Sequence, residues 1–232
     1  MIDPVKVKSF WDSRAQCYST LPLESVANLE QDPENLKLKI NDEVAKVFSW
    51  LPDLKGKRIL DLGAGVGQWT FRFAERGAAD IVAVEYSAGL AEIGAAEARK
   101  RNYSQVAFQV SPAEMYRADK PFDVVFISGL FVYLNDDQAL ALAQNLPGMV
   151  DKEGLVLLRD GTGIAGRHEI NDRMSDHLGV RYSATYRTRQ QYIDLFSAAG
   201  FVLKDDENMF PEGHPLNKYP ETRLRLYRFV PA

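Results

Sequence analysis

Residues 58–70 combine an acidic side chain with three evenly spaced glycines, a combination that suits ligand binding at a turn. The segment RILDLGAGVGQWT starts apolar, becomes glycine-rich and ends helix-forming, which indicates a strand, a tight turn and a helix. A phosphate loop is excluded because it needs GxxxxGK followed by Ser or Thr, and no lysine follows Gly67 until Lys100. A dinucleotide turn needs a small residue where Gln68 stands. Asp61 would repel a pyrophosphate, so the turn favours a ligand with a positive amino group.

A second acidic residue, Glu85, ends the next apolar run, DIVAVEYS. It follows Gly63 by about 20 positions, the spacing at which a doubly wound sheet places a carboxylate on ribose hydroxyls. Alone, the glycines could form a plain strand-to-helix connection, and Glu85 could be a solvated charge. Together at this spacing they indicate an adenosine-containing ligand.

The elements that position these residues follow from the hydrophobic pattern. Apolar runs alternate with amphipathic segments, which predicts a parallel sheet with helices on both faces. The expected strands are RILDLG, DIVAVEYS, VAFQVS, FDVVFISG, GLVLLRD, FVLKDDENM and RLRLYRFV. Helices are expected at residues 69–77 and 88–102, after the capping Asn135, at 188–200 behind the capping Thr188, and along an apolar face from Ile40 to Leu51.

Composition excludes several classes of protein. The net charge is −4 with a pI near 5.5, so the basic surface of a dedicated nucleic-acid binder is absent and DNA is not an expected partner. No apolar run approaches the roughly 20 residues that span a bilayer, and the first residues lack a signal-peptide core. We therefore expect a cytoplasmic protein without a membrane partner. The single cysteine, Cys17, leaves no internal disulfide and is expected to be a packing residue.

Five motifs together resemble the class I S-adenosylmethionine-dependent methyltransferases of the small-molecule type: DLGAGVG, VAVEYS, SPAEM, FDVVFISGLFVYL and GLVLLRD. The resemblance covers about residues 9 to 160. It implies a Rossmann-like, doubly wound α/β sheet of seven strands with the last strand antiparallel, helices on both faces and an N-terminal helical lid. We expect one domain, divided into a cap or lid (1–52), a cofactor-binding core (53–160), a substrate-facing insert (161–187) and a C-terminal helix with a strand pair (188–232).

The resemblance also implies S-adenosylmethionine as cofactor, with S-adenosylhomocysteine as product. The glycine turn would then lie along the methionine part, Glu85 on the ribose and Tyr86 beside the adenine. Ala113 and Glu114 of SPAEM would contact the adenine, although Glu114 could equally be a helix-starting charge. The residues implied for the turn and the end of the fourth strand are Asp61, Gly63, Ala64, Gly65, Gly67 and Ser128.

Two differences from members of this family narrow the range of expected methyl acceptors. The fourth strand ends in SGLF instead of the Asn/Asp-Pro-Pro-Tyr motif of DNA and protein-glutamine methylases, which disfavours those substrates. Ser128 stands where the metal-dependent catechol type supplies a carboxylate ligand, so no metal is expected. The N-terminal segment FWDSRAQCY resembles a lid, by which Trp11, Arg14 and Tyr18 would meet the cofactor; a surface helix packed on the sheet is the alternative.

Candidates for the acceptor side follow the fifth strand. Methyl transfer is an in-line displacement at an electrophilic carbon, and alignment alone can lower such a barrier by about 7–11 kcal/mol. Asp160 at the strand tip, His168 in the insert and Tyr133 after the fourth strand are the candidates for orienting or deprotonating the acceptor. The insert also holds His177 and four arginines that could bind a carboxylate or phosphate: Arg167, Arg173, Arg181 and Arg187.

The acceptor itself is open at this point. The acidic pI and short lid favour transfer to an N or O atom of a small molecule. A methylase of protein N-termini or of tRNA is the second hypothesis, and a subunit that binds cofactor without catalysis is the third. The sequence leaves the oligomeric state open.

Overall fold

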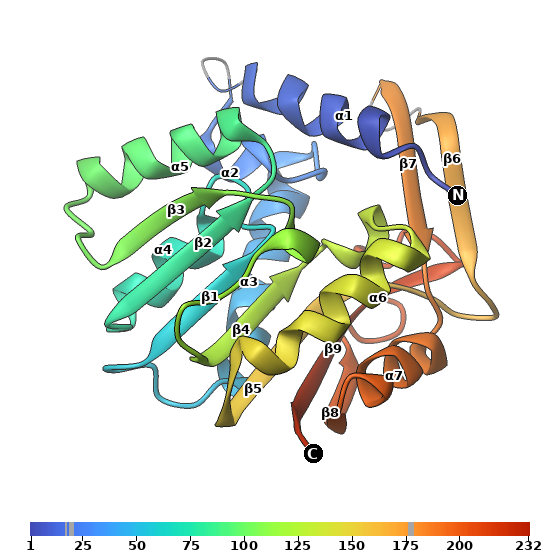
Figure 1. Ribbon diagram of the computed structural model, residues 1–232. Helices are drawn as coiled ribbons and strands as arrows, with labels where there is room; N and C mark the ends of the chain where they lie inside the picture. Colours follow the sequence, from blue (N-terminus) through green and yellow to red (C-terminus); the bar gives the residue numbers. More distant parts are fainter. Residues whose placement is uncertain (17, 19–20, 176–178) are drawn as a thin grey trace.

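The computed structural model describes residues 1–16, 18, 21–175 and 179–232. Its centre is a seven-stranded sheet in the order β3-β2-β1-β4-β5-β9-β8 (Figure 1). The strands are β1 (Arg58–Leu62), β2 (Asp80–Glu85), β3 (Val106–Val110), β4 (Phe122–Ser128), β5 (Val150–Gly163), β8 (Phe201–Asn208) and β9 (Thr222–Pro231). The first five are parallel, and β9 runs antiparallel to both β5 and β8. The predicted fold class, with an antiparallel last strand, is confirmed.

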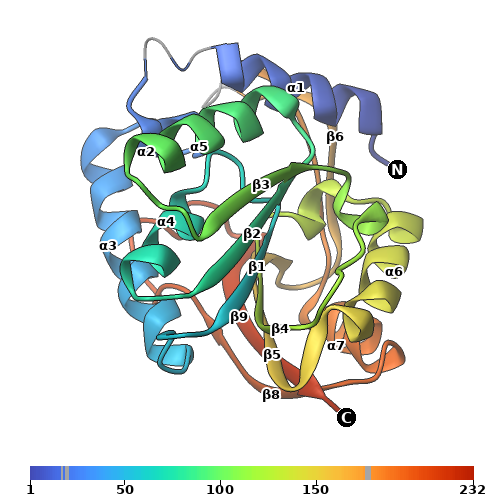
Figure 2. The same ribbon diagram turned by 60° about the vertical axis from the view of Figure 1, so that its left-hand side comes forward.

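Helices cover both faces of this sheet (Figure 2). One face packs against α3 (Pro33–Trp50) and α4 (Gln68–Glu75), with α5 (Ala88–Lys100) beside β3. The other packs against α6 (Asp136–Asn145) and α7 (Arg189–Ala198). Strand residues therefore alternate between two apolar cores, as Ile59 and Leu60 do. This burial on both faces explains why the strands read as continuous apolar runs.

The helix boundaries follow local capping chemistry. Asn135 with Gln138, and Thr188 with Gln191, form the two capping boxes that the sequence predicts for α6 and α7. The helix α3 starts earlier than its apolar face indicates, because the side chain of Asp32 accepts a hydrogen bond from Asn35 N. It ends at Trp50, just before Pro52, as expected.

Part of the insert forms an element that the pattern does not predict. The strands β6 (His168–Ser175) and β7 (Val180–Tyr186) pair antiparallel as a separate two-stranded sheet. Neither face of β6 is apolar, so a strand signal is absent from its sequence. The strand β5 is also longer than expected and carries the chain outward to this hairpin.

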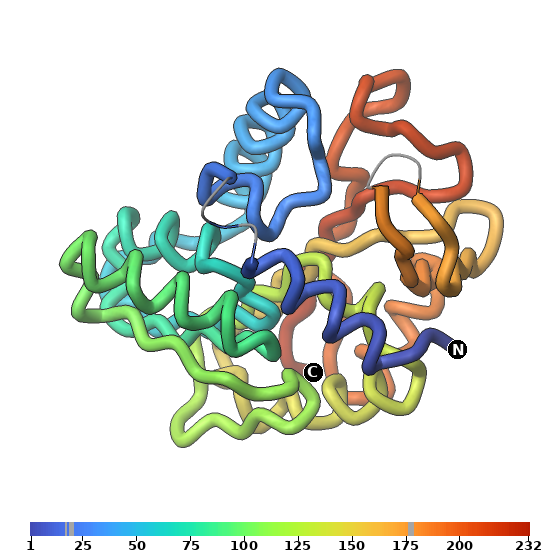
Figure 3. Tube along the Cα trace, turned by 90° about the horizontal axis from the view of Figure 1, so that it is seen from above, coloured from blue at the N-terminus to red at the C-terminus, as the bar shows by residue number. Residues whose placement is uncertain are grey.

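The N-terminal segment lies over the carboxyl ends of the parallel strands. The helix α1 (Pro4–Gln16) crosses this end between α5 and the hairpin, as the view from above shows (Figure 3). Hydrogen bonds join Ile2 to the Asn135 side chain, and Lys6 forms an ion pair with Asp172 of β6. The short helix α2 (Leu23–Val26) and three 3-10 turns, η1 (Ala113–Met115), η2 (Phe131–Tyr133) and η3 (Leu146–Gly148), complete the chain. Among the described helices, none is both long and apolar enough to cross a bilayer.

Candidate active site

A cavity of about 870 Å³ opens at the carboxyl ends of β1, β2, β4 and β5. Ligands bind at this edge in open α/β sheets. The helix α1 and the hairpin contribute to its walls, and so does the segment between β8 and β9. One continuous space therefore reaches from the glycine turn to the substrate-facing insert.

The turn after β1 has the backbone that its glycines predict. Gly63, Gly65 and Gly67 have φ values of +74°, +56° and +86°, which side chains rarely adopt. Gly63, Ala64 and Gly65 line the cavity. Gly67 is not among the lining residues: it caps α4, and a Cβ there would lie 2.6 Å from Cζ of Phe108. Its role is to pack the turn against β3.

The two acidic residues at the predicted cofactor side of the cavity, Asp61 and Glu85, are buried and held by hydrogen bonds. We call this side, with the glycine turn, the cofactor half. Asp61 is 1% exposed and accepts a 2.6 Å hydrogen bond from the Thr70 hydroxyl. Burial raises the pKa of Asp61 to about 7. Glu85 is 8% exposed, and its two carboxylate oxygens accept hydrogen bonds from Gly65 N and Ser87 N, both at 2.8 Å. Burial raises the pKa of Glu85 as well. The carboxylate of Glu85 thus ties β2 to the glycine turn and still faces the cavity.

The other predicted cofactor residues also line this half. Tyr86 is 44% exposed, with the Lys8 ammonium 5.3 Å from its ring centre. Ala113 is buried, while Glu114 accepts a 2.9 Å hydrogen bond from Gln138. Ser128 accepts a 2.9 Å hydrogen bond from Arg159.

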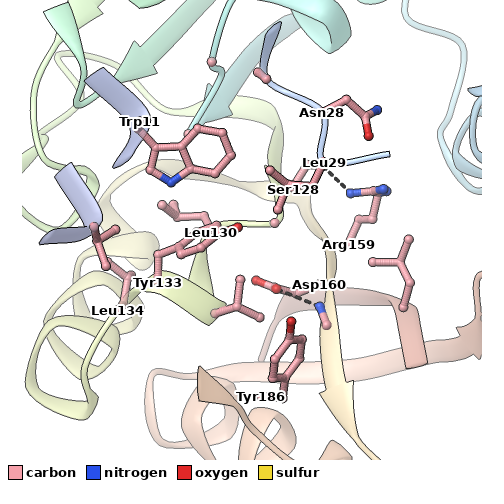
Figure 4. A pocket seen from close by; sticks show the side chains of 18 of the residues that line it. Trp11, Asn28, Leu29, Ser128, Leu130, Tyr133, Leu134, Arg159, Asp160 and Tyr186 are labelled. Carbon is pink, nitrogen blue, oxygen red and sulfur yellow. Dashed lines mark hydrogen bonds between the residues drawn. The ribbon is translucent and has the colours of Figure 1, made fainter. Parts of the chain in front are cut away.

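Of the three predicted lid residues, the structure brings one to the cavity. Trp11 lines it (Figure 4). Arg14 donates to the backbone oxygens of Ser25, Val26 and Asn28 instead, which fixes α1 to the segment around α2. Tyr18 is 40% exposed and is not a lining residue.

The three catalytic candidates all line the cavity, from β5, η2 and β6; we call this side of the cavity the acceptor end. Asp160 is fully buried; its two oxygens accept hydrogen bonds from Phe131 N and Gly161 N, both at 2.7 Å. Burial raises the pKa of Asp160 to about 7. The hydroxyl of Tyr133 lies 3.1 Å from that of Tyr182, and His168 lies beside Tyr186 with ring centres 5.9 Å apart. Figure 4 shows Tyr133 and Tyr186 on either side of Asp160.

A buried ion pair on the cavity wall escapes the sequence reasoning. Arg159 forms an ion pair with Glu43 of α3, and both side chains are buried. The signal was present, because Glu43 follows Ile40 by one helical turn and interrupts an otherwise apolar helix face. The pair ties α3 to the tip of β5.

The arginines of the insert differ in their surroundings. Three of them form ion pairs: Arg167 with Asp136 and Glu169, Arg181 with Asp172, and Arg187 with Asp136. Arg173 lines the cavity, and its side chain has no ion-pair or hydrogen-bond partner among the residues that the structure describes. His177 and Cys17 lie outside the described residues.

Comparisons with known proteins match the chain to methyltransferases. Residues 59–154 match the family model described as "Methyltransferase domain". Phosphoethanolamine N-methyltransferase 1 of Arabidopsis thaliana is 29% identical over 122 residues, which cover 51% of this chain and 24% of that protein. The Caenorhabditis elegans protein of the same name is 26% identical over 201 residues, 86% of this chain and 40% of that protein. The chain thus spans less than half the length of either relative.

Solved structures show the same fold. Phosphoethanolamine N-methyltransferase 1 of Haemonchus contortus, in complex with phosphoethanolamine and S-adenosylhomocysteine, superposes with a TM-score of 0.75 at 22% identity, over 99% of this chain and 49% of that one. Magnesium protoporphyrin IX methyltransferase of Synechocystis PCC 6803, with bound S-adenosylmethionine, superposes with a TM-score of 0.69 at 14% identity. The superposition covers 100% of this chain and 98% of that one. Residues 59–154 therefore match a methyltransferase domain, and the chain has the fold of the class I S-adenosylmethionine-dependent methyltransferases.

Proposed function

We propose that this chain is an S-adenosylmethionine-dependent methyltransferase that methylates the nitrogen of a small amine, with phosphoethanolamine as the first acceptor to test. One observation carries the proposal: a single cavity joins the glycine turn and Glu85 to the buried carboxylate of Asp160. A carboxylate at the acceptor end favours an amine over a neutral alcohol, because it attracts an ammonium. The relatives named phosphoethanolamine N-methyltransferase support the same class of acceptor.

The residues of the cofactor half fit this cofactor. An adenosine needs an acceptor for its ribose hydroxyls and apolar surface for its base. Glu85, held in place by two backbone N–H groups, supplies the acceptor. Ala113, Leu90 and the exposed ring of Tyr86 supply apolar surface. We assign Asp61, Gly63, Ala64, Gly65 and Ser128 to the methionine part. When bound, the cofactor would supply a methyl group attached to positive sulfur.

The residues at the acceptor end would orient the amine. Only an unprotonated nitrogen has the lone pair that attacks, so the amine must lose a proton before transfer. Asp160 would hold the remaining N–H groups, and its pKa of about 7 leaves about half of it ionised at neutral pH and most of it ionised above that pH. Burial raises the pKa of Tyr133 and Tyr182, so both phenols stay protonated and act as neutral walls. The closed surroundings exclude water from the reacting atoms.

A cation on the wall of the same cavity suits the phosphate of the proposed acceptor. Arg173 lies opposite Tyr182 in the pairing of β6 with β7, next to the acceptor end. A guanidinium binds phosphate through charge-assisted hydrogen bonds, and phosphoethanolamine separates its ammonium from its phosphate by two carbons. We therefore assign residues 161–187 to acceptor recognition, residues 1–52 to the lid, residues 53–160 to cofactor binding, and residues 188–232 to closing the sheet.

The test is transfer from methyl-labelled S-adenosylmethionine to three acceptors in parallel: phosphoethanolamine, a peptide with a free N-terminus, and tRNA. We expect label in N-methyl phosphoethanolamine, and at most background label with Asp160→Asn. Label on the peptide or the tRNA alone would contradict the proposal and favour the macromolecular alternative. Binding of S-adenosylhomocysteine with no transfer to any acceptor would favour a non-catalytic subunit.

A further inference from the structure

Two cationic side chains on the cavity wall have no carboxylate partner. Lys39 comes from α3 and Arg72 from α4, and both line the cavity. Neither forms an ion pair within the described part of the chain. The Lys39 ammonium donates to Oδ1 of Asn28, and Arg72 donates to the backbone oxygen of Gln68, both at 2.8 Å. We call these four residues, which all line the cavity, the cationic corner.

The cationic corner lies beside the glycine turn. The segment before α3 packs on that turn, because a Cβ on Gly65 would lie 2.9 Å from the Cβ of Ala27. The next residue, Asn28, accepts the hydrogen bond from Lys39, so this ammonium is held near the turn. Arg72 belongs to α4, the helix that directly follows the turn, and lies one helical turn after its start.

The carboxylates next to this corner are already engaged. Glu43 follows Lys39 by one helical turn on α3, but it forms the buried ion pair with Arg159. Glu30 forms an ion pair with Lys218 at 2.6 Å. Each of these carboxylates has its own cation, so the two cations of the cationic corner are left for a ligand.

Burial makes a cation without a counter-ion unfavourable. The loss of surrounding water lowers the pKa of Lys39 and that of Arg72. Hydrogen bonds to neutral oxygens satisfy the donors but supply no opposite charge. Such departures from the rules of stable folding are expected at functional sites. The cationic corner therefore has the properties of a site for an anionic group.

The methionine part of the proposed cofactor carries one anionic group, its carboxylate, and the glycine turn is assigned to that part. We propose that the cationic corner binds this carboxylate of S-adenosylmethionine, through the Lys39 ammonium and the Arg72 guanidinium. Charge-assisted hydrogen bonds of this kind are the stronger ones in proteins. The inference deepens the proposed function: it rests on the cofactor named there and is independent of the acceptor.

The phosphate of the proposed acceptor is the other anion that could occupy the cationic corner. The position of the corner favours the cofactor instead. Figure 4 shows Asn28 on one side of Ser128, with Trp11 and Tyr133 on the other. Tyr133 belongs to the acceptor end, whereas Asn28 follows the segment that packs on the glycine turn.

The test compares two ligands that differ only in the carboxylate: S-adenosylhomocysteine and its decarboxylated analogue. Calorimetry measures both Kd values. The parent protein should bind S-adenosylhomocysteine at least about tenfold more tightly than the analogue. In Lys39→Met the Kd of S-adenosylhomocysteine should rise about tenfold or more. The Kd of the analogue should stay level or fall, because the variant leaves no cation without a counter-ion. Arg72→Met should act in the same direction.

Matched variants separate charge from structure. Lys39→Arg keeps a cation and should retain most of the preference for S-adenosylhomocysteine. Lys37→Met changes an exposed lysine of the same helix that does not line the cavity, and should leave both Kd values within about twofold of the parent. Without ligand, Lys39→Met should unfold at the temperature of the parent protein or above it, because it removes a buried charge.

Three results would overturn the proposal while the proposed function stands. Equal losses for both ligands in Lys39→Met, with a lower unfolding temperature, would make Lys39 a structural residue. Weaker binding of phosphoethanolamine alone, measured in protein saturated with S-adenosylhomocysteine, would assign the cationic corner to the acceptor. Equal Kd values for the two ligands in the parent protein would show that the carboxylate is not recognised. A folded parent protein that binds neither ligand would contradict the proposed function itself.

Discussion

Replacing Glu85 with Gln is expected to weaken cofactor binding strongly while the fold remains. The carboxylate accepts hydrogen bonds from Gly65 N and Ser87 N, and it is 8% exposed. An amide retains one acceptor oxygen and no charge, so the variant loses one charged hydrogen bond within the site and weakens those expected from ribose. Hydrogen bonds to charged groups contribute about 1.5–3 kcal/mol, which corresponds to about a 10- to 100-fold increase in Kd.

Calorimetry with S-adenosylhomocysteine measures this change. Glu114→Gln is the matched control, because that carboxylate lines the same cavity but bonds to the Gln138 side chain; it should raise the Kd less than about threefold. Thermal unfolding of both variants shows whether the fold is kept. A Glu85→Gln protein that is folded and binds within twofold of the parent would refute the assignment of Glu85 to the cofactor.

Three further changes test other parts of the structure. Asp160→Asn should leave the affinity for S-adenosylhomocysteine unchanged and reduce methyl transfer at least about 100-fold. In the parent protein, the carboxylate attracts the amine above pH 7, and this attraction is lost as the pH falls through the pKa of about 7. Profiles of rate against pH should show this dependence in the parent protein and not in the variant. Gly67→Ala should lower the free energy of unfolding by about 1–3 kcal/mol in urea titrations, because φ is +86° and the new Cβ would meet Phe108; an unchanged midpoint would contradict this. Arg187→Ala should cost about 3 kcal/mol by the same measurement, because the buried guanidinium bonds to two backbone oxygens and to Asp136; a loss below about 1 kcal/mol would show that water replaces those bonds.

The core of the fold could be predicted because its signals are local. Strands buried on both faces give continuous apolar runs, and capping boxes mark helix starts such as Asn135 and Thr188. The hairpin of β6 and β7 gives no such signal. Its residues cover a cavity rather than a core, and in β6 only Ile170 and Met174 are apolar, so the segment reads as a loop. Only the pairing of the two strands reveals it.

Part of the candidate site could also be predicted from the sequence. Glu85 and Asp160 are acids that end the apolar runs of β2 and β5, so the sheet alone brings them to one edge. The orientation of α1 was not predictable: Trp11 and Arg14 are one turn apart, yet Trp11 faces the cavity while Arg14 binds backbone oxygens near α2. Tyr182 joins Tyr133 only because the hairpin folds back, a long-range contact without a local signal.

The most direct test of the central claim is the identity of the product formed from phosphoethanolamine and S-adenosylmethionine carrying a ¹³C-labelled methyl group. The account predicts a new ¹³C signal of a methyl group bonded to nitrogen, which grows with time in the parent protein and is missing with Asp160→Asn. A signal from a methyl group bonded to oxygen, or no signal from a protein that binds S-adenosylhomocysteine, would contradict it.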